Sequence, residues 1–153
     1  MDDTAQILAH MLGMLRSAYI LHQTSHWQCS GPMFYGDHLM LQRIYESVED
    51  EIDTLAEKVV AKYGSAAVSP IEQVQVIQAH VQEMEQKSGG NPIMRAMVVE
   101  QDLQETFENA YQHLKQINSM SLGLDDFIMS VANNHESNVY LLQQRLQQGP
   151  KNV

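Results

Sequence analysis

Breaks in this chain are few, and they separate long segments that repeat apolar residues at helical spacing. The prolines and all glycines except Gly13 fall at a handful of places: 31–36, 64–70, 89–92, 123 and 149–150. Between these places, apolar residues recur every three to four positions, which puts them on one face of an α-helix. No segment alternates apolar and polar residues as a half-buried strand does. The pattern predicts an all-α protein.

Four long helices and one shorter helix are expected. The predicted ranges are 4–30 with Thr4 as N-cap, 37–64 with Asp37 as N-cap, 70–88, 92–118, and 124 or 125 to 149. Four long helices suit a four-helix bundle. We expect residues 1–153 to form one domain. The connection between the second and third long helices can cross the bundle, so these two helices are expected to run parallel.

Charge and composition exclude several classes of function. The formal net charge is −10, and the nine basic residues are scattered. Nucleic-acid binding depends on Lys and Arg contacts to phosphates, so it is not expected. The sequence contains no run of about 18 apolar residues, so no membrane span is expected. The N-terminus lacks the pattern of a signal peptide, and the single cysteine, Cys29, fits a reducing compartment, so we expect a cytoplasmic protein.

Acidic residues and a histidine form a strip along the predicted helix 37–64. On a helical wheel His38 lies beside four acids that fall between the apolar stripe and the mixed-charge face: Glu46, Glu49, Asp53 and Glu57. His22 and His26, one turn apart on the preceding helix, can face one point. Histidine with carboxylates suits Fe²⁺, Zn²⁺ or Mn²⁺. The alternative is a solvated acidic flank with ordinary polar histidines.

Helix geometry divides these residues between two places. His38 and Asp53 are fifteen positions apart on one helix, which is about 22 Å at the α-helical rise. His26 can approach His38 across the corner at 31–36, whereas Asp53 and Glu57 lie far away. Either two half-sites exist, or a twofold axis brings the histidines of one chain against the acids of another. The residues thus favour a site shared between subunits.

Other sequence patterns give weaker evidence for a metal or redox site. No Glu is followed by His three residues later, as bundle-core di-iron sites require. His135 and Asn138 interrupt the apolar stripe of the last helix, which favours a core polar network over a second metal site. Other polar residues of the 92–118 helix are expected on a solvated face: Glu100, Glu105 and His113. The ten methionines are expected to fill core gaps rather than to line a redox site.

At these residues the sequence resembles the Dps family, the mini-ferritins of bacteria and archaea. The pattern comprises a His-Trp pair, a Gly-Pro-x-Phe corner, a second His twelve residues after the first, and Asp-x-x-x-Glu further along. The matching positions are His26-Trp27, Gly31-Pro32-Met33-Phe34, His38, Asp53 and Glu57. The short helix before the third long one agrees too, and His135-Glu136 with Leu141-Leu142 loosely matches the family's closing segment. The resemblance covers about residues 5–148.

The resemblance implies a ferritin-like bundle, a function and a set of metal ligands. Dps-like proteins are hollow shells of twelve subunits that oxidise Fe²⁺ with hydrogen peroxide or O₂, store the ferric mineral and relieve oxidative stress. By analogy this chain is a cytoplasmic ferroxidase and a homo-oligomer built from twofold dimers. His26, with Asp53 and Glu57 of a partner, would hold the first iron. His38 would help to hold the second, with Glu57 bridging. Trp27 would intercept radicals nearby.

One position departs from the family pattern. Gln42 stands where the family has Asp four residues after the second His. A neutral amide is expected to weaken the second iron position. Glu46, one turn further on, is the residue that could compensate, and Zn²⁺ and Mn²⁺ are the alternative occupants. The alternatives are a non-enzymatic metal-binding cage with a decayed oxidation centre and a nucleoid-associated protein. The net charge of −10 disfavours the second alternative. No Lys/Arg-rich tail is expected either, because only three residues precede the first predicted helix and the chain ends in GPKNV.

Overall fold

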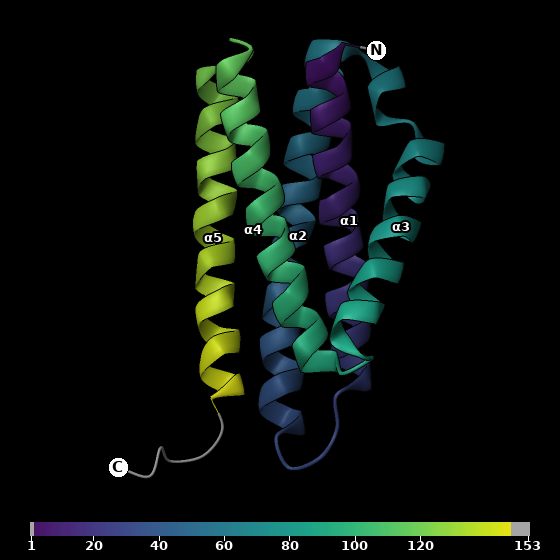
Figure 1. Ribbon diagram of the computed structural model, residues 1–153, viewed down its shortest axis with the longest axis vertical. Helices are drawn as coiled ribbons and strands as arrows, with labels where there is room; N and C mark the ends of the chain where they lie inside the picture. The colour runs from purple at the N-terminus through teal and green to yellow at the C-terminus, as the bar shows by residue number, and fades with distance from the viewer. Residues whose placement is uncertain (1, 148–153) are drawn as a thin grey trace.

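A computed structural model describes residues 2–147 of the chain (Figure 1). Within this range the chain contains five α-helices and no strand, which confirms the all-α prediction. The helices are α1 (Asp3–Gln28), α2 (Phe34–Tyr63), α3 (Pro70–Ser88), α4 (Pro92–Gln116) and α5 (Leu122–Leu146), and a short 3₁₀ turn, η1 (Ser65–Val68), precedes α3. None of the described helices is both long and apolar enough to cross a membrane.

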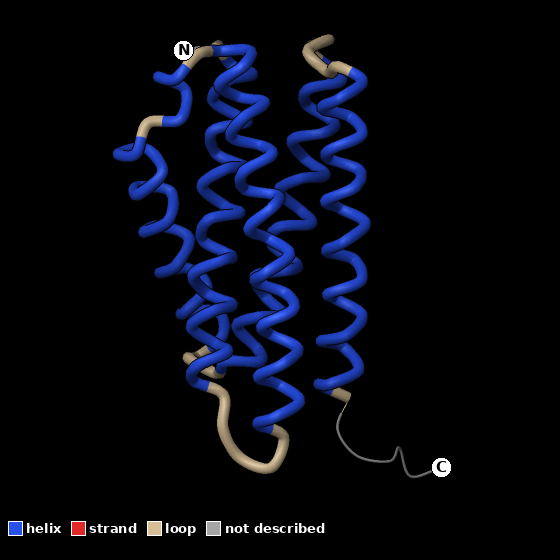
Figure 2. Tube along the Cα trace, turned by 180° about the vertical axis from the view of Figure 1, so that it is seen from behind, coloured by secondary structure: helices blue, strands red, loops and turns tan. Residues whose placement is uncertain are grey.

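The four long helices form a bundle, and α3 lies on its outside. In Figures 1 and 2 the chain descends along α1, rises along α2, descends along α3, rises along α4 and descends along α5. The connection through η1 and α3 returns the chain to the end where α2 began. Helices α2 and α4 therefore run parallel, as the length of that connection predicts.

Helix starts depend on which side chain caps them, and three of the expected starts were misplaced. Asp2, not Thr4, caps α1, because its Oδ1 accepts a hydrogen bond from the Thr4 amide at 3.3 Å. Helix α2 begins at Phe34, before Asp37, and its N-cap, Met33, makes no side-chain hydrogen bond. Ser121 caps α5, which therefore begins two residues earlier than the earlier of the two starts expected. The expected end of this helix, near residue 149, lies outside the described residues.

Asp37 has a different role from the cap that was expected. Its buried carboxylate pairs with Arg145 of α5, with Oδ1 at 2.7 Å from Nε and Oδ2 at 3.0 Å from an Nη. This two-pronged ion pair is geometrically well matched. It ties the first turn of α2 to the last turn of α5, next to His38.

The two starts that combine a polar cap with proline were predicted correctly. The Ser69 hydroxyl accepts from the Glu72 amide, and the Asn91 side chain accepts from the amides of Ile93 and Met94. Proline follows each cap at the first helical position, where its missing N–H costs no hydrogen bond. Gly89 ends α3 in the left-handed conformation, with φ of 60°.

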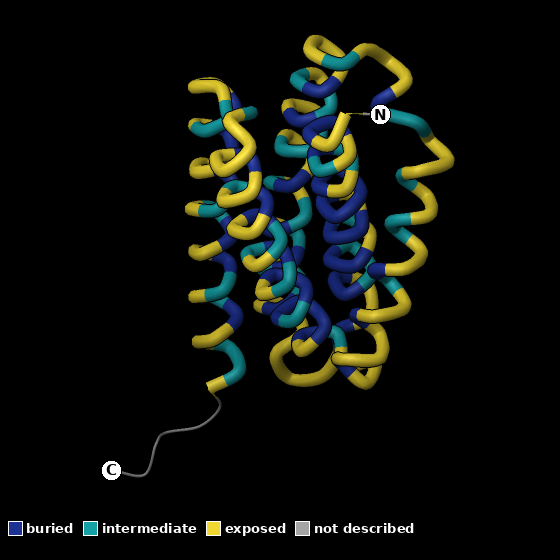
Figure 3. The backbone as a smooth tube through the Cα atoms, turned by 45° about the horizontal axis from the view of Figure 1, so that its top comes forward, coloured by how far each residue is buried: buried dark blue, intermediate teal, exposed yellow. Residues whose placement is uncertain are grey.

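The buried interior is divided into two apolar clusters, with the dark buried stretches facing inward in Figure 3. The larger cluster extends along most of the bundle and includes Leu12, Leu15, Leu55, Leu103 and Phe107. The smaller one lies toward the α1–α2 corner: Cys29, Leu41, Ile44, Ile93, Ala96, Met97 and Leu142. On α5 two buried polar residues, His135 and Asn138, lie between the two clusters in sequence.

Gly13 sets how closely α3 approaches α1. A Cβ atom built on Gly13 would lie 2.5 Å from a methyl carbon of Val76, which is well inside van der Waals contact. Only a glycine therefore lets α3 pack at this depth, although glycine costs a helix interior about 1 kcal/mol relative to alanine.

Candidate metal centre

His26 and His38 meet where α1 ends and α2 begins. The Nδ1 of each ring donates a hydrogen bond to the backbone carbonyl of the other residue, at 2.6 Å and 2.8 Å. A carbonyl oxygen only accepts, so both Nδ1 atoms carry a hydrogen. The rings stack with centroids 3.5 Å apart and planes 14° apart. Within the described residues neither Nε2 has a hydrogen-bond partner, so both are available as metal ligands.

Buried Arg95 holds the last turn of α1 in place. Its Nε donates to the Ser25 hydroxyl at 3.1 Å, and its two terminal nitrogens donate to Gln28 at 2.7 Å and to Glu85 of α3 at 2.6 Å. The Arg95 side chain is only 2% exposed. Because Arg95 belongs to α4, it joins three helices directly beside His26.

Asp53 and Glu57 lie far from the two histidines. Both are exposed on α2, which continues without a break from Phe34 to Tyr63. Fifteen residues of unbroken helix keep His38 and Asp53 about 22 Å apart along the axis. In agreement, no three His, Cys, Asp or Glu side chains among residues 2–147 converge as one metal ion would require.

Gln42 and Trp27 flank the histidines. The Gln42 amide nitrogen donates to Glu46 at 2.8 Å, which leaves the Gln42 carbonyl oxygen as its free end. Trp27 is 65% exposed. Its ring makes no contact with another ring among the described residues.

His22 does not share a point with His26, contrary to the expectation from their spacing. The His22 ring is fully buried, and its Nε2 donates to Glu100 of α4 at 2.7 Å. Its Nδ1 is buried without a partner among the described residues. The other Glu100 oxygen accepts from His135 Nδ1 of α5 at 2.5 Å, and His135 Nε2 donates to Glu51 of α2 at 2.8 Å. One residue from each long helix therefore enters a buried chain of hydrogen bonds.

The prediction that Glu100 lies on a solvated face was wrong. Its side chain is fully buried. The signal was present in the sequence, because Glu100 follows Ala96 and Met97 and precedes Leu103 at helical spacing. Glu105 and His113 are exposed, as expected. The polar network predicted at His135 is confirmed by its hydrogen bonds to Glu100 and Glu51. Asn138 is also buried, but among the described residues its amide nitrogen has no hydrogen-bond partner.

The network separates charges inside the bundle. Burial opposes ionisation of Glu100, but the positive charge and hydrogen bond of His135 and the hydrogen bond of His22 outweigh it and lower the Glu100 pKa to about 2. Burial likewise opposes protonation of His135. The charge and hydrogen bond of Glu100, with those of Glu51, overcome it and raise the His135 pKa to about 10. At neutral pH the bundle centre therefore holds an imidazolium between carboxylates.

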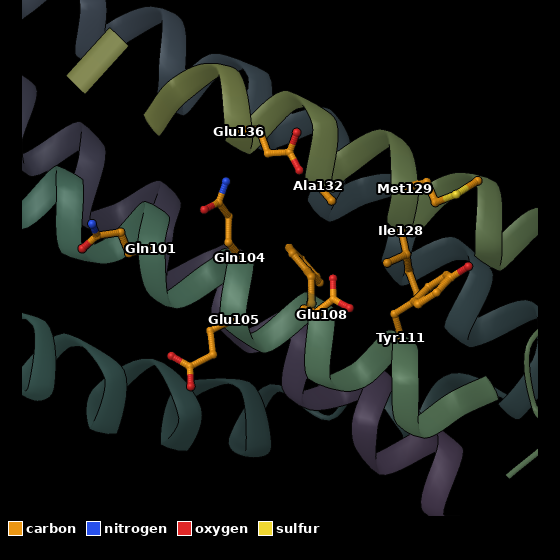
Figure 4. A pocket seen from close by; sticks show the side chains of 10 residues that line it. Gln101, Gln104, Glu105, Glu108, Tyr111, Ile128, Met129, Ala132 and Glu136 are labelled. Atoms are coloured by element: carbon orange, nitrogen blue, oxygen red, sulfur yellow. The ribbon is translucent and has the colours of Figure 1, made fainter. Parts of the chain in front are cut away.

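A surface pocket lies between α4 and α5, and Glu105 is one of the residues that line it (Figure 4). Its walls combine apolar side chains, among them Phe107, Ile128 and Met129, with the carboxylates of Glu108 and Glu136. None of the four predicted metal ligands lines it.

Comparisons with known proteins agree with the fold. The model of a ferritin-like domain family matches residues 5–148. Among solved structures the chain is similar to Dps from Thermosynechococcus elongatus, with TM-score 0.78 and 17% identity over 98% of this chain and 94% of that one. It is also similar to DpsC from Streptomyces coelicolor, with TM-score 0.77 and 19% identity over 96% and 85%.

A third similar structure is Dps from Vibrio cholerae O1, described as a member of a broad superfamily of ferritin-like diiron-carboxylate proteins. Its TM-score is 0.77, with 17% identity over 94% of this chain and 89% of that one. No curated protein matches the sequence.

Proposed function

Because the chain belongs to the ferritin family, we propose that it is a Dps-type mini-ferritin, a ferroxidase that oxidises Fe²⁺ with hydrogen peroxide and stores the ferric product in a shell. The paired histidines carry this proposal. His26 and His38 are locked in the same tautomer and keep both Nε2 atoms free. Locking a ligand's other nitrogen to a carbonyl is how proteins prepare histidines for metals. O₂ is the alternative oxidant. We also propose that residues 1–153 form a single domain.

The remaining ligands come from a second subunit. His26 and His38 lie at one end of α2, and Asp53 and Glu57 lie toward the other, so a twofold axis across α2 joins the two half-sites twice. Exposed apolar side chains support an interface here. Several lie on α1 and around the α1–α2 corner: Ile20, Trp27, Met33, Phe34, Tyr35 and Leu39. Twofold dimers of this kind assemble further into a dodecamer.

Iron is the substrate of this centre. His26, with Asp53 and Glu57 of the second subunit, binds the first Fe²⁺, and His38, with Glu57 as a bridge, helps to bind the second. Two Fe²⁺ and one hydrogen peroxide, with two protons, give two Fe³⁺ and two water molecules. The carboxylates offset the growing positive charge of the iron. The net charge of −10 favours the entry of cations, disfavours DNA and suits a cytoplasmic protein.

Loss of one ligand from either half-site tests the function. We expect His26→Ala and Asp53→Ala each to slow peroxide-dependent Fe²⁺ oxidation at least about tenfold, because even the partners of metal ligands contribute 10–100-fold to affinity. Stopped-flow absorbance of ferric products measures the rate. His113→Ala, which changes an exposed histidine of α4, is the matched control. Equal rates in wild type and both variants would refute the proposal.

Gln42 supports a second candidate function, a cage that binds metal without oxidising it. Its amide brings no charge to the second iron position, and Glu46 engages its nitrogen. If this position limits activity, Gln42→Asp should bind the second Fe²⁺ more tightly and oxidise iron faster than wild type. Titration calorimetry with Fe²⁺ under anaerobic conditions, followed by peroxide kinetics, measures both. A wild-type protein that binds iron but turns over only after this substitution is the cage.

A further inference from the structure

A series of aromatic rings leads away from the paired histidines. The His26 ring, already stacked on His38, meets the ring of Tyr45 edge-on, with centroids 5.3 Å apart and planes 71° apart. Tyr45 meets Tyr19 in the same manner, at 5.6 Å and 77°. On the opposite side Phe34 stacks on His38 at 4.9 Å. Tyr45 is therefore the ring in this series that both touches a proposed iron ligand and can lose an electron readily.

The series also has a direction. Tyr19 lies on α1 and lines a surface pocket together with Asp53 and Glu49 of α2. Within one subunit the rings therefore start at the histidine half-site and lead to a pocket that Asp53 of the acidic half-site also lines. In the proposed dimer those two half-sites belong to different iron centres. The two tyrosines thus lie between the centres.

The chemistry of peroxide creates a need for such a side chain. Reducing one hydrogen peroxide to two water molecules takes two electrons, and one Fe²⁺ supplies only one. With neutral Gln42 at the second position, the centre is expected to hold a single Fe²⁺ for part of the time. A second electron donor in contact with the ligands would then prevent release of a hydroxyl radical.

We propose that Tyr45 is a redox-active side chain that supplies the second electron when one Fe²⁺ is bound, and that Tyr19 shares the resulting radical. The inference rests on the proposed function. Fe²⁺, hydrogen peroxide, one tyrosine and one proton give Fe³⁺, a tyrosyl radical and two water molecules. The tyrosine O–H bond breaks, and its proton is among those consumed in the water formed. A later Fe²⁺ and a proton restore the tyrosine and leave a second Fe³⁺.

This assignment differs from the radical-intercepting role that the family resemblance gives to Trp27. Trp27 follows His26 in the chain, but its ring is 65% exposed and contacts no other described ring. Tyr45 is partly buried and touches the His26 ring directly. Contact between the rings, rather than neighbourhood in sequence, favours Tyr45 as the electron donor.

Freeze-quench electron paramagnetic resonance tests the proposal. Wild-type protein loaded with one Fe²⁺ per centre is mixed with hydrogen peroxide, and we expect a tyrosyl radical within the time of iron oxidation. Tyr45→Phe keeps the ring and should abolish most of the signal, whereas Tyr19→Phe should shorten its lifetime. Tyr140→Phe, which changes an exposed tyrosine of α5, is the matched control and should leave the signal unchanged. Ring-deuterated tyrosine should narrow the signal and so identify its origin.

A second readout is the release of hydroxyl radical, measured with a spin trap. At one Fe²⁺ per centre, wild type should release little of it, and Tyr45→Phe should release several times more, because a single Fe²⁺ then supplies only one of the two electrons that peroxide needs. Wild type that oxidises Fe²⁺ without a tyrosyl signal, or with a tryptophan signal, would overturn the relay alone. Unchanged iron oxidation in His26→Ala and Asp53→Ala would overturn the proposed function itself. The two failures are therefore distinguishable.

Discussion

Mixing two inactive variants is expected to restore Fe²⁺ oxidation to about a quarter of the wild-type rate. One variant lacks the histidine half-site (His26→Ala with His38→Ala), and the other lacks the acidic half-site (Asp53→Ala with Glu57→Ala). When the two are unfolded and refolded together, about half of the twofold dimers contain one chain of each kind. Each such dimer has one intact centre and one that lacks every ligand, so about a quarter of all centres recover.

The distance between the two half-sites is what makes the mixing experiment decisive. A centre built within one chain could never be repaired by mixing, and the roughly 22 Å between His38 and Asp53 along α2 is what excludes it. Peroxide-dependent iron oxidation is measured for each variant alone and for the mixture, with native mass spectrometry to count mixed dimers. A mixture of wild type with the histidine variant is the control for refolding yield. Mixed dimers that form but stay inactive would contradict a shared centre.

Glu100→Gln should lower the free energy of unfolding by about 3–5 kcal/mol. The substitution keeps the size of the side chain but leaves the His135 imidazolium without its closest counter-charge, and breaking a buried ion pair in this way costs about that much. Glu105→Gln, on the exposed side of the same helix, is the matched control and should change stability by less than about 0.5 kcal/mol. Chemical denaturation followed by circular dichroism measures both.

The pH dependence of stability separates charge from packing. The Glu100 pKa falls from 4.5 to about 2 on folding, so its contribution is present above pH 4.5 and is lost as the pH falls toward 2. The His135 pKa rises from 6.5 to about 10, so its contribution is complete below pH 6.5 and is lost as the pH rises through 10. Wild type should therefore lose stability in both windows. Glu100→Gln should show a weaker slope in each, and parallel curves for the two proteins would contradict the ion pair.

The fold was predictable because its signals are local. Ser69-Pro70 and Asn91-Pro92 each combine a polar cap with a proline, and both helices begin there. Asp37 has the same capping chemistry, but Arg145, more than a hundred residues away, engages its carboxylate. A distant ion pair of this kind leaves no local pattern. For that reason the start of α2 was misplaced by three residues.

The positions of the two predicted half-sites could be inferred from the sequence, but the buried surroundings of His22 and Glu100 were not. Spacing alone brought His26 to His38 and kept Asp53 away from both, because a corner and an unbroken helix decide those distances. Spacing could not distinguish His22 from His26, since both lie on one side of α1 and only the structure shows which neighbours each ring has. Glu100 was assigned to solvent by its charge, although its position follows the apolar stripe of α4. A charged residue on an apolar stripe should direct attention to a buried partner.

The unbroken course of α2 also has a meaning for regulation. Because no single chain can complete the proposed centre, we expect a newly made or dissociated subunit to have no ferroxidase activity. Specific activity should therefore fall on dilution below the dissociation constant of the dimer. At the lowest levels it should fall in proportion to subunit concentration, so that the total rate falls with the square of that concentration. A cell would thus confine the reaction of iron with peroxide to assembled shells, where the ferric product has somewhere to go.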